Sequence, residues 1–198
     1  MIPSNDQFKK AIEAFDAYNL NDPNKEECNG QVFSKEVLYA QRMTDRLNRY
    51  APDAPDYVQL AARCQHIGRW EIARDHFPMD KKGYLQWRNQ EKIHHAKIAE
   101  AILISCQYNT ETIEKVKFLV LKKELFTNAD TQLLEDVICL VFIEFYIEAF
   151  ATKHDDDKMV DILKKTLKKI SPKGIAASSE IKVSGKIQSL IQKAVSEI

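Results

Sequence analysis

The sequence predicts an all-α fold, and three observations lead to that prediction. The chain has five glycines and six prolines in 198 residues, which leaves little material for the tight turns that all-β folds need. Apolar side chains recur at three- and four-residue steps along most of the chain, a spacing typical of amphipathic helices. Residues that favour helix N-caps precede several of these stretches. We therefore expect one helical bundle, a single domain over residues 1–198.

Two helices joined by a loop are expected in the first fifty residues. Ser4 suits the N-cap of the first helix, whose apolar face would hold Phe8, Ile12 and Phe15. Residues 21–30, with the sequence NDPNKEECNG, have the turn chemistry of a loop. Ser34 then suits the start of a second helix that ends near Pro52.

A third helix leads into a segment without a clear period. Pro55 fits the first turn of this helix, which carries Leu60 and Ala61 toward His66. Residues 68–83, GRWEIARDHFPMDKKG, contain a proline, two glycines, aromatic side chains and both signs of charge. We expect an irregular loop here. Loops of this length are often functional, and a plain surface connection is the equal alternative.

The second half of the chain predicts a series of helices. The first of them carries one face formed by Tyr84, Trp87, Glu91, His94, Ile98 and Ile102. Thr110 is expected to cap the next helix, and residues 133–150 are apolar nearly all round, which indicates a helix at the centre of the fold. A helix beginning at Asp155 should end before Pro172, and a last helix should start at about Ser179.

Composition and charge exclude several classes of protein. The 29 basic and 29 acidic residues give a formal charge of zero, so no overall field attracts nucleic acid or a membrane surface. A surplus of lysine after residue 150 is the one feature in favour of an RNA-associated factor, and we expect no nucleic-acid partner. The four cysteines form no CxxC pair, and no apolar run is long enough to span a bilayer. The expected location is the cytoplasm.

Three segments lie in the order and at the separations of a known helical superfamily. They are QHIG at residues 65–68, HHAKIAEAI at 94–102 and QLLEDVICL at 132–140. Together they resemble the HD-domain phosphohydrolases, in which an HDIG-like tetrad ends one helix and a histidine pair opens another. The resemblance implies an HD-like core over about residues 34–150, with helices in residues 155–198 packing on it.

The same resemblance implies a chemistry for which this chain lacks most of the residues. In the superfamily, two histidines and two aspartates hold a divalent metal that activates water for attack on a phosphate ester. Here Gln65 and His66 occupy the tetrad's histidine and aspartate positions, and Tyr39 stands at the position of the first histidine. The final aspartate falls at Ile138, or at Asp136 if the register slides by two. The usual metal site is therefore largely absent.

A second resemblance rests on more distinctive strings. QHIGRWEIAR, GYLQWR, LEDVICLVF, KHDDDK and KTLKKIS look like segments of a family catalogued as domain of unknown function 4202, over about residues 38–175. That family commonly has proline at Ala73, arginine at Lys82 and tryptophan at Leu167. The resemblance implies no particular activity. It carries over a set of polar positions: Gln65, His66, Arg69, Arg74, Arg88, His95, Glu135, Asp136, Lys153, His154, Lys158 and Lys165.

Four of these positions are candidates for catalysis. We predict a catalytic centre formed by His66, His95, Glu135 and Asp136, because two imidazoles and two carboxylates can transfer protons. His66, His95 and Asp136 would also suit a divalent metal such as zinc or iron in a remodelled site. The alternatives are hydrogen-bonded core histidines and a structural salt bridge. Carboxylates in an apolar helix are costly unless they are paired or ligate something.

Cationic side chains near the irregular loop are candidates for ligand binding. Guanidinium groups suit phosphate or carboxylate, and surface ion pairs are the alternative for any one of them. The acidic run at residues 153–158 fits helix capping better than metal binding. The predicted ligand-binding residues are Gln65, Arg69, Arg74, Arg88, Lys122, His154 and Lys158.

These observations lead to two hypotheses for function. The first is a hydrolase or binder of a small anionic, phosphate-containing and nucleotide-like metabolite, with a remodelled site and a divalent metal as a possible cofactor. The second is a non-catalytic binding or protein-interaction module on a degenerate HD scaffold. The substituted QHIG tetrad favours the second, and the polar groups kept in three segments favour the first.

Overall fold

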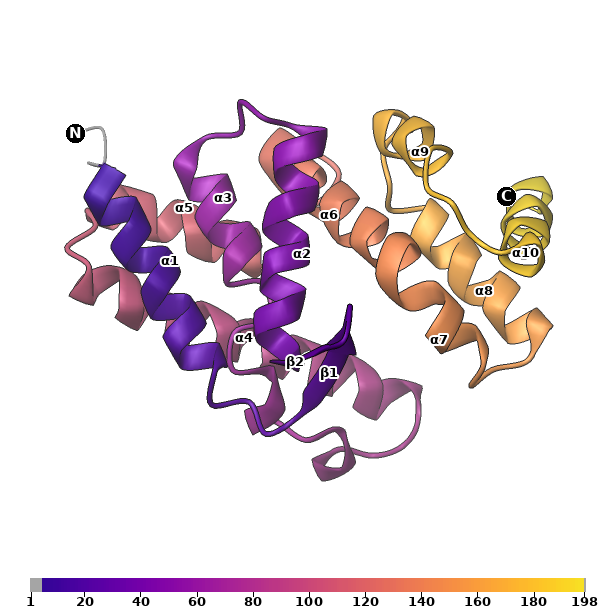
Figure 1. The fold of residues 1–198 in the computed structure, drawn as a ribbon, viewed down its shortest axis with the longest axis horizontal. Coiled ribbons are helices and arrows are strands. Elements are labelled where there is room, and N and C mark those ends of the chain that lie inside the picture. The colour runs from indigo at the N-terminus through magenta and orange to yellow at the C-terminus, as the bar shows by residue number, and fades with distance from the viewer. Residues whose placement is uncertain (1–4, 198) are drawn as a thin grey trace. The chain divides into compact units, whose positions relative to one another are not determined.

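A computed structural model describes residues 5–197 and divides the chain into two compact units, Met1–Lys123 and Glu124–Ile198. Each unit is mostly helical (Figure 1), as the sequence predicted. The sequence analysis placed the change from core to C-terminal helices near residue 150, whereas the structure places its division at 123/124. That the chain forms a single domain, and that it resembles the HD scaffold, stay predictions.

The first unit is built from five longer helices and a small hairpin. In chain order they are α1 (Asn5–Asn19), β1 (Lys25–Cys28), β2 (Gln31–Ser34), α2 (Lys35–Tyr50), α3 (Asp56–Arg63), α4 (Lys81–Ser105) and α5 (Thr110–Val120). Helix α3 packs on α1, α2 and α5. Fully buried side chains fill the space between the helices, chiefly Phe15, Met43, Leu47, Leu60, Ile67, Leu103 and Leu119. The predicted N-cap Ser4 lies outside the described residues.

The segment expected to be only a loop contains half of an antiparallel hairpin. Strand β1 pairs with β2 in a register that sets Cys28 opposite Gln31. Asn29 and Gly30 form the turn, with φ angles of 52° and 76°. Two successive residues with positive φ form the type I′ turn that joins strands most tightly, and Asn-Gly is its preferred sequence. The Asn29-Gly30 dipeptide in residues 21–30 therefore indicates a hairpin as well as a loop.

Between α3 and α4, the chain makes two short 3-10 turns, η1 (Arg69–Glu71) and η2 (Arg74–His76). Helix α4 begins after Asp80, whose carboxylate accepts a hydrogen bond from the backbone N–H of Gly83. The predicted inward face of α4 is partly wrong. Tyr84 is largely exposed, and His95 is buried in place of His94. Glu91 and His95, four residues apart, share one buried face of α4.

The second unit contains α6 (Ala129–Val141), α7 (Ile147–Ala151), α8 (Asp156–Leu167), α9 (Pro172–Ser178) and α10 (Gly185–Ser196). A π-helical turn, η3 (Phe142–Tyr146), joins α6 to α7 within the predicted apolar helix. The sequence analysis missed α9 and began the last helix too early. Ser171 caps α9 and Pro172 is its first residue, so this proline starts a helix as well as following one.

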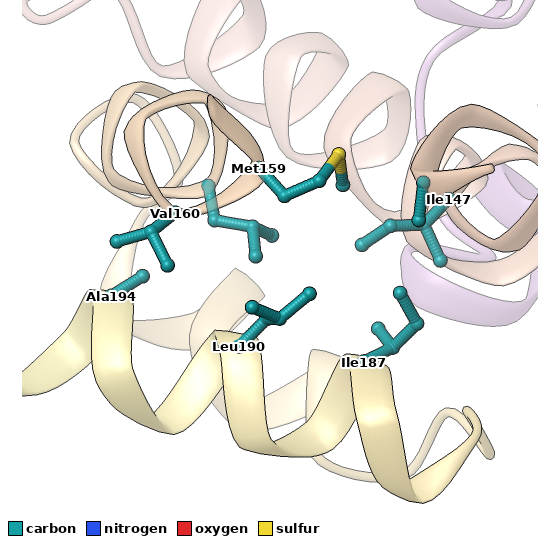
Figure 2. Packing of buried hydrophobic residues seen from close by; sticks show 8 residues of the cluster. Ile147, Met159, Val160, Ile187, Leu190 and Ala194 are labelled. Atoms are coloured by element: carbon teal, nitrogen blue, oxygen red, sulfur yellow. The ribbon is translucent and has the colours of Figure 1, made fainter. Parts of the chain in front are cut away.

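Apolar side chains from α7, α8 and α10 form the core of the second unit. Figure 2 shows Ile147 of α7 and Met159 and Val160 of α8 facing Ile187, Leu190 and Ala194 along one side of α10. Leu163 and Ala151, which are 1% and 8% exposed, also belong to the cluster. Met159 and Leu163 therefore lie on the buried side of α8. No helix within residues 5–197 is both long and apolar enough to cross a membrane.

We predict that Leu163→Ala lowers the free energy of unfolding of this unit by about 2–5 kcal/mol, because the cavity left by leucine closes only in part. Val195→Ala is the control, since Val195 lies on the exposed side of α10. Urea unfolding followed by circular dichroism measures both. Equal effects of the two substitutions would contradict the assignment of Leu163 to the core.

Candidate functional site

A group of polar and aromatic side chains gathers inside the first unit, where α2 and the chain after α3 meet α4. We call it the His66 cluster. Its members are Glu36, Tyr39, His66, Arg69, Arg88, Glu91 and His95. Glu36 and Tyr39 come from the first turns of α2, His66 and Arg69 from the turn after α3, and the other three from α4.

A left-handed turn at Gly68 brings these elements together. Gly68 has a φ of 68°, and a Cβ there would lie 2.4 Å from Cδ1 of Ile98 and 3.3 Å from Nε2 of His94. Its backbone N–H donates to Oδ1 of Asn19 in α1. Only glycine fits both this dihedral angle and this close approach to α4. The chain can therefore leave α3 and pass directly against the middle of α4.

His66 lies at the centre of the cluster and is a neutral imidazole with a defined tautomer. Nη1 of Arg69 is 3.1 Å from its Nε2. Since a guanidinium can only donate, Nε2 accepts this hydrogen bond and the proton sits on Nδ1. Nδ1 lies 3.5 Å from Oε2 of Glu36. Burial, followed by the charges of Arg69 and Arg88, holds the pKa of His66 well below its usual value.

The ring of His66 stacks on Tyr39. The ring centroids are 4.0 Å apart and the planes are 11° from parallel. Tyr39 is buried and stands where the HD resemblance would place a metal-binding histidine. A phenol ring packed flat against the imidazole fixes the plane of His66 without ligating anything. The tyrosine therefore acts as a support for His66.

Glu91 is buried completely and is held by two arginines. Its Oε2 lies 3.0 Å from Nη1 of Arg88 and 3.5 Å from Nη2 of Arg69, while its exposed fraction is 0%. The guanidinium carbon of Arg69 lies 5.1 Å from the centre of the Trp87 ring. Burial raises the pKa of Glu91, and the two guanidinium charges act against that rise. The arginines themselves stay about a quarter exposed.

His95 presents one ring nitrogen to the backbone and the other to the cluster. Its Nδ1 donates to the carbonyl oxygen of Ile67 at 2.6 Å, which leaves Nε2 as an unprotonated acceptor. Burial lowers the pKa of His95 to about 3, so the ring is neutral at physiological pH. The centres of the His66 and His95 rings are 5.9 Å apart. The two predicted histidines therefore do lie together.

Glu36 is the group in the cluster best suited to exchange a proton near neutral pH. Burial raises its pKa to about 7, while the nearby charges of Arg69 and Lys35 act in the opposite direction. Asp22 and Glu91 add to the rise. A carboxyl group with a pKa near the working pH can serve as a general acid or base.

Several acceptor atoms in and beside the cluster are buried without a hydrogen-bond partner among residues 5–197. They are Oε2 of Glu36, Oε1 of Gln65, Oε1 of Glu91 and Nε2 of His95. Most buried polar atoms in folded proteins are paired, and each exception calls for a reason. Three of these four belong to side chains already linked through His66 and Arg69.

The other predicted residues of the first unit have different surroundings. Gln65 is buried next to His66. Arg74 donates to the carbonyl oxygens of Phe77 and Pro78, so its guanidinium holds the shape of the irregular loop. Lys122 follows α5 and its charge is among those that lower the pKa of His66. The predicted role of Arg74 in ligand binding competes with this contact to the backbone.

Glu135 and Asp136 lie in the second unit, where both are buried and have structural partners. Asp136 accepts hydrogen bonds from the backbone N–H and the hydroxyl of Ser171, the N-cap of α9. Oε1 of Glu135 lies 3.9 Å from the ammonium of Lys169. Asp136 therefore fixes the start of α9. That these carboxylates meet the histidines in one catalytic centre stays a prediction.

His154 and Lys158 also belong to the second unit. The ring of His154 lies against Phe150, with centroids 4.5 Å apart. Lys158 is exposed in the first turn of α8, and its backbone N–H donates to the carboxylate of Asp155. The helix-capping interpretation of the acidic run is therefore confirmed.

Within residues 5–197, no group of three or more histidine, cysteine, aspartate or glutamate side chains is placed to hold a metal ion. The predicted ligand set of His66, His95 and Asp136 gains no support from this. In addition, Nε2 of His66 already accepts a hydrogen bond from Arg69, so this nitrogen is occupied.

The sequence analysis missed Glu36 and gave Glu91 no role. Both could have been found from helical spacing. Glu91 falls three residues after Arg88 and four before His95, on a face that was predicted to be buried. Glu36 precedes Tyr39 by three residues and shares its face of α2. A carboxylate on an inward face is costly and points to a paired or functional group.

Comparison with known proteins gives a family for the chain. The profile of the family described as Domain of unknown function (DUF4202) matches residues 9–191, nearly the whole sequence. No curated protein and no solved structure matches the chain.

We predict that Glu36→Gln changes the pH dependence of stability. Between pH 4.5 and 7 the unfolded chain releases the Glu36 proton and the folded chain keeps it, so the contribution of Glu36 to stability falls as the pH rises. Relative to the wild type, the variant should gain about 3 kcal/mol across this window. His66 and His95 titrate in both proteins and cancel in the difference. Urea unfolding at pH 5 and pH 8 measures the difference in free energy of unfolding between the variant and the wild type. If that difference is the same at both pH values, the raised pKa of Glu36 is contradicted.

Proposed function

The chain belongs to the family described as Domain of unknown function (DUF4202), and we propose that it binds a small phosphate-containing metabolite at the His66 cluster. We propose further that it hydrolyses a phosphate ester there, in line with the HD-like resemblance of its sequence. The rival, a binding module without catalysis, uses the same residues.

The observation that carries the proposal is the surplus of positive charge at the cluster. Arg69 and Arg88 share one buried carboxylate, Glu91, and both guanidinium groups stay partly exposed. The imidazoles are neutral, and Glu36 is only partly ionised near pH 7. A guanidinium has five N–H donors, and Glu91 and His66 occupy few of them. A phosphate group would supply the missing negative charge and accept the remaining donors.

Glu36 would supply the acid–base step of a hydrolysis. Its carboxyl group exchanges a proton near pH 7, and Nδ1 of the neutral His66 lies 3.5 Å from its Oε2, without a hydrogen bond between them. Arg69 contacts both His66 and Glu91, so an anion on Arg69 would lie close to this pair. The arginines would stabilise charge on the phosphoryl oxygens, and Glu36 would take or give the proton of the attacking water.

The replacement of HD-type metal ligands favours the rival function, a binder without catalysis. Tyr39 stacks on His66, and Arg69 occupies a nitrogen of His66. One variant distinguishes the two functions. If the protein is a hydrolase, Glu36→Gln should abolish release of inorganic phosphate from an ester while the phosphate is still held by Arg69 and Arg88. A wild-type protein that binds phosphate esters and releases no phosphate from them would be a binder.

We predict that Arg88→Gln weakens binding of a phosphate ester by about tenfold or more, because one charge-assisted hydrogen bond is lost. Isothermal titration calorimetry with ribose 5-phosphate is the measurement. Arg49→Gln removes the same charge from an exposed position on α2 and should bind like the wild type. Equal affinities for all three proteins would place the anion elsewhere, and no binding by the wild type would remove the proposed function.

A further inference from the structure

The buried acceptors of the His66 cluster have no role in holding a phosphate. Oε1 of Glu91, Oε2 of Glu36 and Nε2 of His95 are acceptor atoms, and no donor among the described residues meets them. Their side chains are 0%, 5% and 2% exposed. Phosphate oxygens would be repelled by these atoms, whereas N–H or O–H groups would be bound by them.

We propose that these three acceptors form a second subsite, which binds the hydroxyl groups of a phosphorylated sugar or polyol whose phosphate lies on Arg69 and Arg88. This inference rests on the proposed function and names its class of ligand. The cluster offers donors and acceptors at different degrees of burial. The guanidinium donors belong to side chains that are about a quarter exposed, and the acceptors belong to neighbouring side chains that are 5% exposed or less.

The positive charges around the subsite favour a ligand whose hydrogen-bond donors are neutral. Arg69 and Arg88 flank Glu91, and the charge of Lys122 also acts on His66. An ammonium group or a metal cation would add positive charge to a site that already has a surplus. Hydroxyl groups donate hydrogen bonds without bringing charge, so they fit the acceptors at lower cost.

Aromatic packing favours hydroxyl groups over the amino groups of a nucleobase. A base is usually bound between aromatic or guanidinium planes. The guanidinium of Arg69 already lies over Trp87, and the Tyr39 ring already stacks on His66. The unpaired acceptors of the cluster can therefore bind hydroxyl groups, whereas its aromatic faces already have stacking partners and are not free to hold a base.

Two variants of His95 separate this subsite from the phosphate position. His95→Asn keeps an N–H near the place of Nδ1, which can still donate to the Ile67 carbonyl, and removes the acceptor at Nε2. His95→Gln keeps an acceptor at the far end. Affinities for methyl phosphate, glycerol 3-phosphate, ribose 5-phosphate and adenosine monophosphate are measured by calorimetry for the wild type and both variants.

We expect the wild type to bind ribose 5-phosphate and glycerol 3-phosphate about tenfold more tightly than methyl phosphate, which has no hydroxyl group. His95→Asn should lose this tenfold preference for the hydroxyl-bearing esters while its affinity for methyl phosphate is unchanged. His95→Gln should keep part of the preference. Equal binding of all the esters, or a margin that persists in His95→Asn, would overturn the subsite and leave the proposed function standing. A preference for adenosine monophosphate over ribose 5-phosphate would indicate base recognition and overturn it too. No binding of any ester would overturn the proposed function itself.

A measurement on the wild-type protein covers the case in which a His95 variant fails to fold. In protein labelled with ¹⁵N at histidine, the Nε2 resonance of His95 should shift when ribose 5-phosphate is added, because this nitrogen gains a donor. Methyl phosphate should leave it in place. Identical responses to the two esters would contradict direct contact with a hydroxyl group.

Discussion

The hydrogen bond from Nδ1 of His95 to the carbonyl oxygen of Ile67 holds the His66 cluster together. It joins the turn after α3 to the middle of α4, two segments 28 residues apart in sequence. The bond exists because Gly68 can turn the chain left-handed in a space that a Cβ would fill. It also fixes the tautomer of His95 and so determines that Nε2 points its lone pair into the protein. Together with the hydrogen bond from Gly68 to Asn19 and the ion pair between Arg69 and Glu91, this contact sets the position of the turn against α4.

Electrostatics then explains why these ionisable groups are present together. A carboxylate as deeply buried as Glu91 would cost several kcal/mol alone, and two guanidinium groups offset that cost. Burial, to which the same two charges add, lowers the pKa values of His66 and His95, so the imidazoles act as acceptors and donors without becoming cations. Burial raises the pKa of Glu36, and the nearby cations act in the opposite direction. Burial and the two guanidinium charges together therefore set the ionisation of the carboxylates and imidazoles in the cluster.

How far the sequence predicts this structure depends on whether local or long-range contacts decide each feature. Local rules were enough for α2, α3 and α8, and for α5 apart from its cap, which is Asn109 in place of the predicted Thr110. They failed for α9, because seven residues give no period to read, and for part of the face of α4, where Tyr84 is exposed and His95 is buried in place of His94. Asp136 was singled out for its cost in an apolar helix, and its partner Ser171 lies 35 residues away. Spacing cannot reveal such a partner.

Tyr39 and Arg69 show that packing and hydrogen bonding hold His66 in place. The Tyr39 ring lies flat against His66, with the ring centroids 4.0 Å apart. Arg69 meets the same imidazole at the nitrogen that a metal would need. Both contacts orient His66 toward Glu36, and both would be lost if His66 turned to ligate an ion. His66 and His95 are therefore held as neutral hydrogen-bonding groups, and the chemistry proposed for this chain combines them with proton exchange at Glu36.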